Sequence, residues 1–181
     1  MKEAEHFTFD VRAGFSAAVL RVLPLCRHAI ALVDPDLSDW PFEQRDTADA
    51  LRAALLRGAR LRLLLADPDW LERRGTRFMR LRREHAARIE CRAMPTTLHV
   101  TESALVADGQ HLVRRVFHEG FRGAASIASP LRSIAVAAHT AANDDGRRMS
   151  NSGWRLPTGR RGSVTGTNTA FGGGFGTARA N

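Results

Sequence analysis

The sequence predicts an α/β fold, with a largely parallel sheet flanked by helices and a β-hairpin at the C-terminal end of the domain. Short apolar runs of strand length alternate with segments of helical periodicity over residues 7–92. Two of these runs end in the same Asp-Pro-Asp sequence, which begins at Asp34 and at Asp67. The pair Asp108-Gly109 separates two further strand-like runs, which is typical of a hairpin because Gly accepts the positive φ of a tight turn.

Each element is predicted from its own local pattern. We expect strands at residues 7–9, 28–33, 61–66 and 88–92, and a hairpin over 98–117 whose return strand is 110–117. We expect helices at residues 11–27, 42–57 and 70–87, where apolar side chains recur at helical spacing. Asp10 and Asp69 are the expected N-caps of the first and third helices, and Gly58 ends the second.

Length and charge indicate one folded domain and a tail. The chain has 181 residues and a net charge of +8, of which residues 1–122 contribute +3 and residues 123–181 contribute +5. From residue 143 onward the chain holds almost no aliphatic side chains, so it cannot bury enough apolar surface to offset its conformational entropy. We therefore expect an α/β domain over 1–122 and a low-complexity, disordered basic tail over 123–181.

Composition also bears on localisation. No run of about 18 apolar residues occurs, so no membrane partner or membrane-spanning segment is expected. The N-terminal residues lack the apolar stretch of a secretory signal. Cys26 and Cys91 form no metal-binding or redox motif, which favours two reduced thiols in a cytoplasmic protein.

The order of elements, together with Leu105-Val-Ala-Asp-Gly109, resembles one half of the phospholipase D superfamily. In that family an HxKxxxxD motif on such a hairpin supplies a nucleophilic His, a phosphate-binding Lys and a supporting Asp. Two halves combine, often across a homodimer. Aligned on Asp108, the His position falls on Thr101 and the Lys position on Ser103, with His99 two residues earlier. The resemblance implies a degenerate site, in which His99 and Asp108 are the catalytic candidates if activity survives.

A second resemblance is closer. The segments 33–40 (VDPDLSDW), 89–92 (IECR) and 105–109 (LVADG) are similar to an uncharacterised bacterial family of degenerate phospholipase-D-like domains, some fused to GNAT-type acetyltransferases. This resemblance implies a binding or accessory role. The acetyl-CoA loop of GNAT enzymes is absent, so acetyl transfer is not implied. Family members continue into a helix with a Phe-Asp-x-x-Trp pattern that residues 123–181 lack, and one hypothesis is that this tail is translated out of frame.

A group of carboxylates follows the second and third predicted strands, where ligands of open α/β sheets bind. These residues and a nearby tryptophan form one candidate ligand site: Asp34, Asp36, Asp39, Trp40, Asp67 and Asp69. The cluster could bind Mg²⁺ or a cationic ligand. The alternative, which the Asp-Pro turns favour, is that these side chains cap local turns and helices. The histidines show no metal-binding spacing, and no metal or cofactor is predicted.

Arginines supply two further candidate sites. Arg114 and Arg115 point to opposite faces of the return strand, so one of them could enter the cleft and replace the missing lysine as a phosphate ligand. Arg73, Arg77 and Arg80 share the outward face of the third helix, where they could contact a nucleic-acid backbone. The alternatives are an edge strand protected from aggregation and a solvated helix in an arginine-biased sequence.

These observations favour a cytoplasmic, non-catalytic phospholipase-D-like domain that binds a phosphate-bearing ligand or a protein partner. One alternative is a weak phosphodiesterase that acts as a homodimer through His99. The other is non-specific nucleic-acid binding through the arginine-rich helix and the tail.

Overall fold

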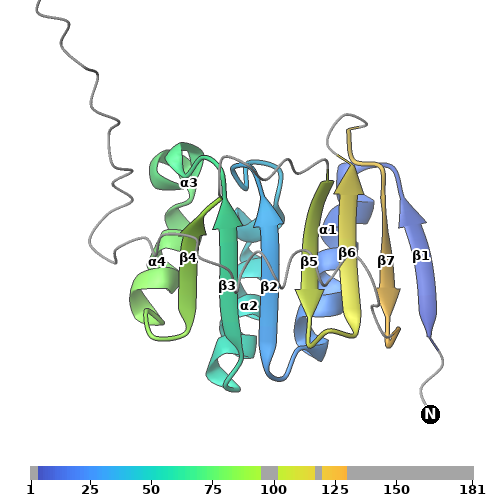
Figure 1. The fold of residues 1–181 in the computed structure, drawn as a ribbon, viewed down its shortest axis with the longest axis horizontal. Coiled ribbons are helices and arrows are strands. Elements are labelled where there is room, and N and C mark those ends of the chain that lie inside the picture. The colour runs from blue at the N-terminus through green and yellow to red at the C-terminus, as the bar shows by residue number, and fades with distance from the viewer. Residues whose placement is uncertain (1–3, 95–101, 117–119, 130–181) are drawn as a thin grey trace, which may run out of the picture.

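The computed structural model describes residues 4–94, 102–116 and 120–129, and these fold around one seven-stranded sheet (Figure 1). The strands are β1 Glu5–Phe9, β2 Ala29–Asp34, β3 Arg60–Leu65, β4 Ile89–Ala93, β5 Glu102–Ala107, β6 His111–Val116 and β7 Gly123–Ile127. The α-helices are α1 Arg12–Val22, α2 Arg45–Leu56, α3 Asp69–Arg74 and α4 Thr76–Glu84. Two short 3₁₀ turns, η1 Leu23–Leu25 and η2 Pro41–Glu43, follow α1 and precede α2.

The strand order is β1-β7-β6-β5-β2-β3-β4, which confirms an α/β fold with a flanked sheet and a C-terminal hairpin. Parallel pairing is confined to β2–β3 and β3–β4, where helical crossovers connect successive strands. The other pairs, β1–β7, β2–β5, β5–β6 and β6–β7, are antiparallel. The sheet is therefore mixed. The hairpin strand β5 pairs with β2, and β7 and β1 extend the sheet beyond β6.

Strand β7 is absent from the elements that the sequence predicts, and it extends the sheet beyond the expected domain boundary at residue 122. Its sequence, Gly-Ala-Ala-Ser-Ile, has little strand propensity of its own. It is extended because it pairs on one side with β1 and on the other with β6. A side chain at Gly123 would meet the carbonyl oxygen of Arg114 at 2.2 Å, so this close approach requires Gly. Residues 130–181 of the expected tail lie outside the described residues.

The helices differ from prediction at their ends. Helix α1 ends at Val22 and continues as a 3₁₀ turn that contains Pro24, and its N-cap is Val11, with no side-chain cap from Asp10. Asp69 is the first residue of α3 and not its cap. The expected third helix is broken into α3 and α4 at Gly75, where a Cβ would lie 2.6 Å from the carbonyl oxygen of Leu71.

Helices α1, α2 and α4 cover one face of the sheet (Figure 1), and the main core lies between them and the strands. A separate small apolar cluster lies on the other face and consists of Ala31, Ala104, Val106 and Leu112. Within the described residues, no helix has the length and apolar character needed to cross a membrane.

Candidate functional site

Three polar side chains converge where β2 ends, β5 begins and β6 ends. The strand register sets Val33 opposite Ala104 and Ser103 opposite Arg115, so Asp34, Ser103 and Arg115 occupy the same edge of the sheet. All three residues are buried, with 1%, 0% and 5% of their surface exposed. Buried polar groups require partners, and the contacts of these three define the candidate site.

The Asp34 carboxylate is the centre of the site. Its Oδ1 accepts hydrogen bonds from the backbone N–H groups of Asp36 at 3.0 Å and Leu37 at 2.6 Å. Its Oδ2 accepts from the indole Nε1 of Trp40 at 2.8 Å and from the hydroxyl of Ser103. These four hydrogen bonds occupy the roughly four acceptor positions that a carboxylate offers. Asp34 therefore holds the turn after β2 in place, and Leu37 adopts a left-handed φ of 65° within that turn.

Arg115 extends the network toward the surface. Its Nη2 lies 4.0 Å from Asp34 Oδ2, and its Nη1 lies 2.9 Å from Asp39 Oδ2 and donates to the carbonyl oxygen of Gly120 at 3.1 Å. Asp39 is in turn bound by Arg12 at 3.0 Å. The result is a charge-alternating row from Asp34 through Arg115 and Asp39 to Arg12, with no net formal charge. We call this row, together with Ser103, the Asp34–Arg115 network.

Aromatic rings pack against the buried end of this network. The guanidinium of Arg115 lies 5.8 Å from the ring centroid of Phe15 and 5.5 Å from that of Phe121. Phe15 also packs against Trp40, with ring centroids 5.0 Å apart. Ion pairs in such apolar surroundings are screened far less than pairs in water, so the charges are held firmly. The arrangement satisfies its own charges and presents neither a free nucleophile nor a free cation.

The other carboxylates of the predicted ligand site make local contacts. Asp36 accepts the N–H of Ser38 at 2.9 Å, and Asp67 accepts the N–H of Asp69 at 2.8 Å. Asp69 also pairs with Arg73 on its own helix at 2.7 Å. No group of three or more metal-ligating side chains occurs within the described parts of the chain. The structure thus brings Asp34, Asp39 and Trp40 together and engages Asp36, Asp67 and Asp69 in turns and helix ends.

Asp108, the catalytic candidate that the resemblance implies, lies at the opposite end of the hairpin strand from Ser103. Asp108 follows Ser103 by five positions along the extended strand, which is a distance of about 16 Å. The Asp108 carboxylate accepts the backbone N–H groups of Arg27 at 2.6 Å and of His28 and Ala29 at 2.8 Å. Burial alone would raise the pKa of Asp108, but these N–H donors outweigh it and lower the pKa. Asp108 therefore anchors the start of β2, and the structure gives it no place beside Asp34.

The remaining predicted residues divide between the two faces of the molecule. Arg114 points away from Arg115, as the alternation of the strand requires, and its Nη1 lies 3.7 Å from Glu102 Oε2. Arg73, Arg77 and Arg80 are exposed, and the break at Gly75 divides them between α3 and α4. Arg73 pairs with Asp69 and Arg80 with Glu84, each within one helix. His99 and Thr101 lie outside the described residues.

Sequence reasoning missed several members of the Asp34–Arg115 network. The sequence indicates Ser103 only as the residue in the lysine position of the motif, and it gives no indication that Arg12, Phe15 and Phe121 belong to the site. The sequence offers one indication of this network, which is the alternation of side chains along β6. That alternation directs Arg115 to the helix side of the sheet. Arg12 and Asp39 are 27 residues apart, and no local pattern connects them.

The arrangement of this sheet places the protein among phospholipase-D-type folds. The fold resembles that of Nuc from Salmonella typhimurium, a phospholipase D family member, with a TM-score of 0.58, 14% identity, and coverage of 81% of this chain and 98% of Nuc. It also resembles TrmBL2, an archaeal chromatin protein that binds DNA, with a TM-score of 0.54 and 15% identity. That match covers 76% of this chain, which spans about half (51%) of TrmBL2.

The sequence itself identifies the family. Residues 12–142 match the family described as a domain of unknown function, DUF7931, and the chain belongs to that family. No curated protein matches the chain in sequence.

Proposed function

We propose that this chain is a non-catalytic phospholipase-D-like domain that binds a phosphate-bearing ligand or a protein partner as an accessory unit. The observation that carries the proposal is the hydroxyl of Ser103 bound to the buried carboxylate of Asp34. Ser103 occupies the position that the phospholipase D motif gives to its phosphate-binding lysine. A neutral hydroxyl that already donates to Asp34 supplies no charge to a phosphate.

The neighbouring cation does not replace that lysine. The guanidinium of Arg115 is the nearest candidate, but its Nη1 is bound to Asp39 and to the carbonyl oxygen of Gly120. A phosphate would have to displace Asp39, whose side chain is 33% exposed, from its ion pair with the buried Arg115, and the arginine would lose that charge compensation. The motif lacks its lysine, and the charges of the network are paired with one another. Both observations support a non-catalytic role.

Hydrolysis of bis(p-nitrophenyl) phosphate tests the absence of catalysis. The full chain is expected to release no more p-nitrophenol than its His99→Ala variant, at any concentration that would allow a homodimer to form. Hydrolysis that disappears in His99→Ala would refute the proposal and support the weak homodimeric phosphodiesterase.

An accessory role in the cytoplasm also agrees with two cysteines that form no disulfide, Cys26 and Cys91.

Nucleic-acid binding is the second candidate, and it rests on the exposed arginines of α3 and α4 and on the likeness of the fold to a DNA-binding chromatin protein. Binding of this kind would involve the phosphate backbone and weaken steeply with salt. Fluorescence anisotropy of labelled single- and double-stranded oligonucleotides across a salt series tests it with the full chain. Loss of binding in the Arg77→Glu/Arg80→Glu double variant would support this surface, whereas unchanged binding would exclude it.

A further inference from the structure

A groove crosses the sheet face opposite the helices, and its floor is β7. On this face β7 carries only the small side chains of Ala124 and Ser126. The register sets Ser126 between His6 of β1 and Leu112 of β6, and Ala124 between Thr8 of β1 and Arg114 of β6. Small residues on the middle strand, with longer ones on both neighbours, leave a furrow. Its walls lie about 10 Å apart, which is the width of two strand spacings.

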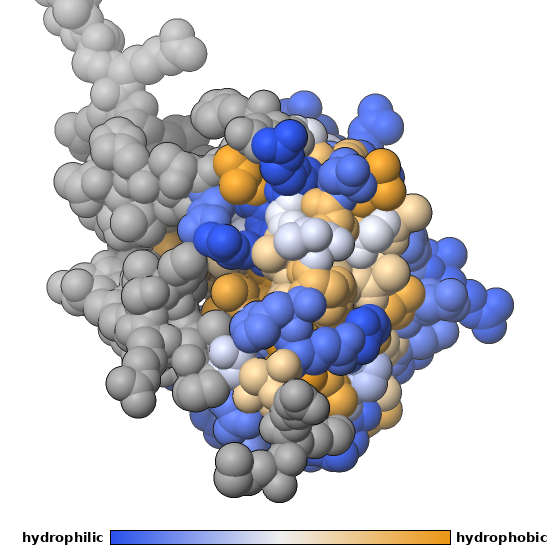
Figure 2. All heavy atoms as spheres, turned by 90° about the vertical axis from the view of Figure 1, so that its right-hand side faces the viewer, coloured by the Kyte–Doolittle hydropathy of each residue, from blue (hydrophilic) through white to orange (hydrophobic). Residues whose placement is uncertain are grey.

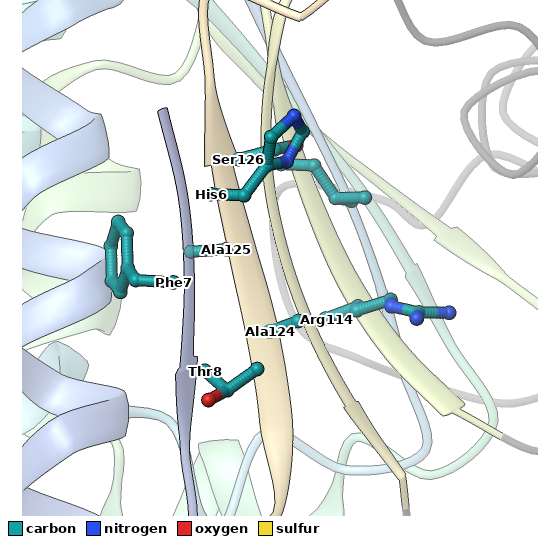
Figure 3. Close-up of a pocket in the computed structure, with 8 residues that line it drawn as sticks. His6, Phe7, Thr8, Arg114, Ala124, Ala125 and Ser126 are labelled. Atoms are coloured by element: carbon teal, nitrogen blue, oxygen red, sulfur yellow. The ribbon is translucent and has the colours of Figure 1, made fainter. Parts of the chain in front are cut away.

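The groove has a volume of about 410 Å³, which lies in the range of small-molecule sites. The lining residues are His6, Phe7, Thr8, Leu112, Arg114, Ala124, Ala125 and Ser126. Figure 3 shows His6 and Arg114 on one side of the sheet and the ring of Phe7 on the other, toward the helices. Phe7 therefore contributes its backbone, and the groove itself is formed by the outward side chains of three strands.

The charges of this groove favour an anion. Arg114 is 42% exposed in its side chain, and its ion pair with Glu102 at 3.7 Å is longer than a hydrogen bond. The guanidinium N–H groups can therefore donate to a ligand. Thr8 and Ser126 add hydroxyl donors and His6 adds an imidazole, and none of the described residues that line the groove is acidic. Figure 2 views the molecule from the edge of the sheet formed by β1, where hydrophilic and hydrophobic side chains are mixed.

We propose that this groove is the ligand site of the domain and that it takes a phosphate monoester with a small apolar substituent. The inference rests on the proposed function, and it moves the site from the enclosed edge near Asp34 to the opposite sheet face. The planar guanidinium of Arg114 matches the paired oxygens of a phosphate. The hydroxyls of Thr8 and Ser126 donate to the remaining oxygens, and Leu112 with Ala124 contacts the apolar substituent.

Isothermal titration of the full chain with phenyl phosphate tests the site. The expected result is saturable binding that weakens at least tenfold in Arg114→Gln. The matched control is Arg45→Gln, which removes another exposed arginine in a 3.7 Å ion pair and should leave the affinity unchanged. Ala124→Leu fills the groove and should abolish binding without removing a charge, while its melting temperature reports that the sheet remains folded.

Three results would overturn the proposal: no saturable binding, an affinity unaffected by Arg114→Gln, or an equal loss in Arg45→Gln. Titrations with inorganic phosphate and with benzyl alcohol separate the two halves of the ligand. Both should bind more weakly than phenyl phosphate, and equal binding of inorganic phosphate would contradict the apolar contact. Failure here leaves the absence of hydrolysis untouched, because bis(p-nitrophenyl) phosphate turnover is measured separately on His99→Ala.

Discussion

Replacing Arg115 by Met tests whether the Asp34–Arg115 network holds the edge of the sheet. Methionine keeps much of the apolar stem of arginine and removes its charge and its hydrogen bonds. The side chain of Arg115 is 7% exposed, and its loss leaves Asp34 buried without a cation. Breaking a buried ion pair in this way costs about 3–5 kcal/mol.

The structure favours the lower end of that range. Asp34 keeps its donors from the turn, from Trp40 and from Ser103, and Asp39 keeps Arg12 at the surface. We therefore expect the free energy of unfolding to fall by about 3 kcal/mol. For a chain of this size that loss lowers the melting temperature by about 6–12 °C.

Urea and thermal unfolding of the full chain measure this loss. The matched control is Arg114→Met, one residue earlier on β6, whose exposed ion pair with Glu102 is worth at most about 1 kcal/mol. In the Asp34→Asn background, Arg115→Met should cost less, because the charge that it leaves uncompensated has gone. A loss below about 1 kcal/mol for Arg115→Met, or equal losses for the two arginines, would refute the reasoning.

Further predictions concern the two ends of the sheet and the helix break. Asp108→Asn, which tolerates the left-handed φ of 53°, should destabilise the chain at pH 7 by about 1.5–3 kcal/mol through weakened backbone contacts. Because folding lowers the pKa of Asp108, the contribution of this carboxylate to the free energy of unfolding is complete above about pH 4. The contribution disappears as the pH falls through the folded-state pKa, so the free energies of unfolding of the variant and of the parent chain should converge in acid. Gly75→Ala should cost about 1–3 kcal/mol in urea unfolding, because its Cβ would overlap Leu71. Gly109→Ala meets no neighbour but should still cost about 1–2 kcal/mol, because its φ of 68° strains a residue that carries a Cβ. Burial raises the pKa of Cys26 and of Cys91 to about 12, so a thiol reagent at pH 8 should label neither until denaturant is added; rapid labelling of the native chain would contradict that burial.

The elements that the sequence predicts well are those whose signals are local. The apolar runs before Asp34 and Asp67 mark β2 and β3 to within a residue or two, and Asp108-Gly109 marks the hairpin turn. Strand β7 has no such signal, since its conformation depends on pairing with β1, more than a hundred residues earlier. Its small side chains looked like the start of a tail, although they form the floor of the groove.

The candidate site shows the same division. Alternation along β6 predicts that Arg114 and Arg115 point to opposite faces, and they do. The partners of Arg115 come from distant loops and from α1, so no spacing in the sequence reveals them. The two Asp-Pro-Asp segments predict a ligand site at a shared edge of the sheet. In the structure Asp36 and Asp67 instead accept hydrogen bonds from nearby backbone N–H groups, as the turn chemistry favours.

Hydrolysis of bis(p-nitrophenyl) phosphate by the full chain, compared with His99→Ala, tests the central proposal most directly. The account predicts identical, background-level release of p-nitrophenol from both proteins, because on the proposed function Ser103 supplies no cation to a phosphate and Arg115 is held by Asp34 and Asp39. Release that is above background in the parent chain and lost in His99→Ala would contradict it and establish a working phosphodiesterase.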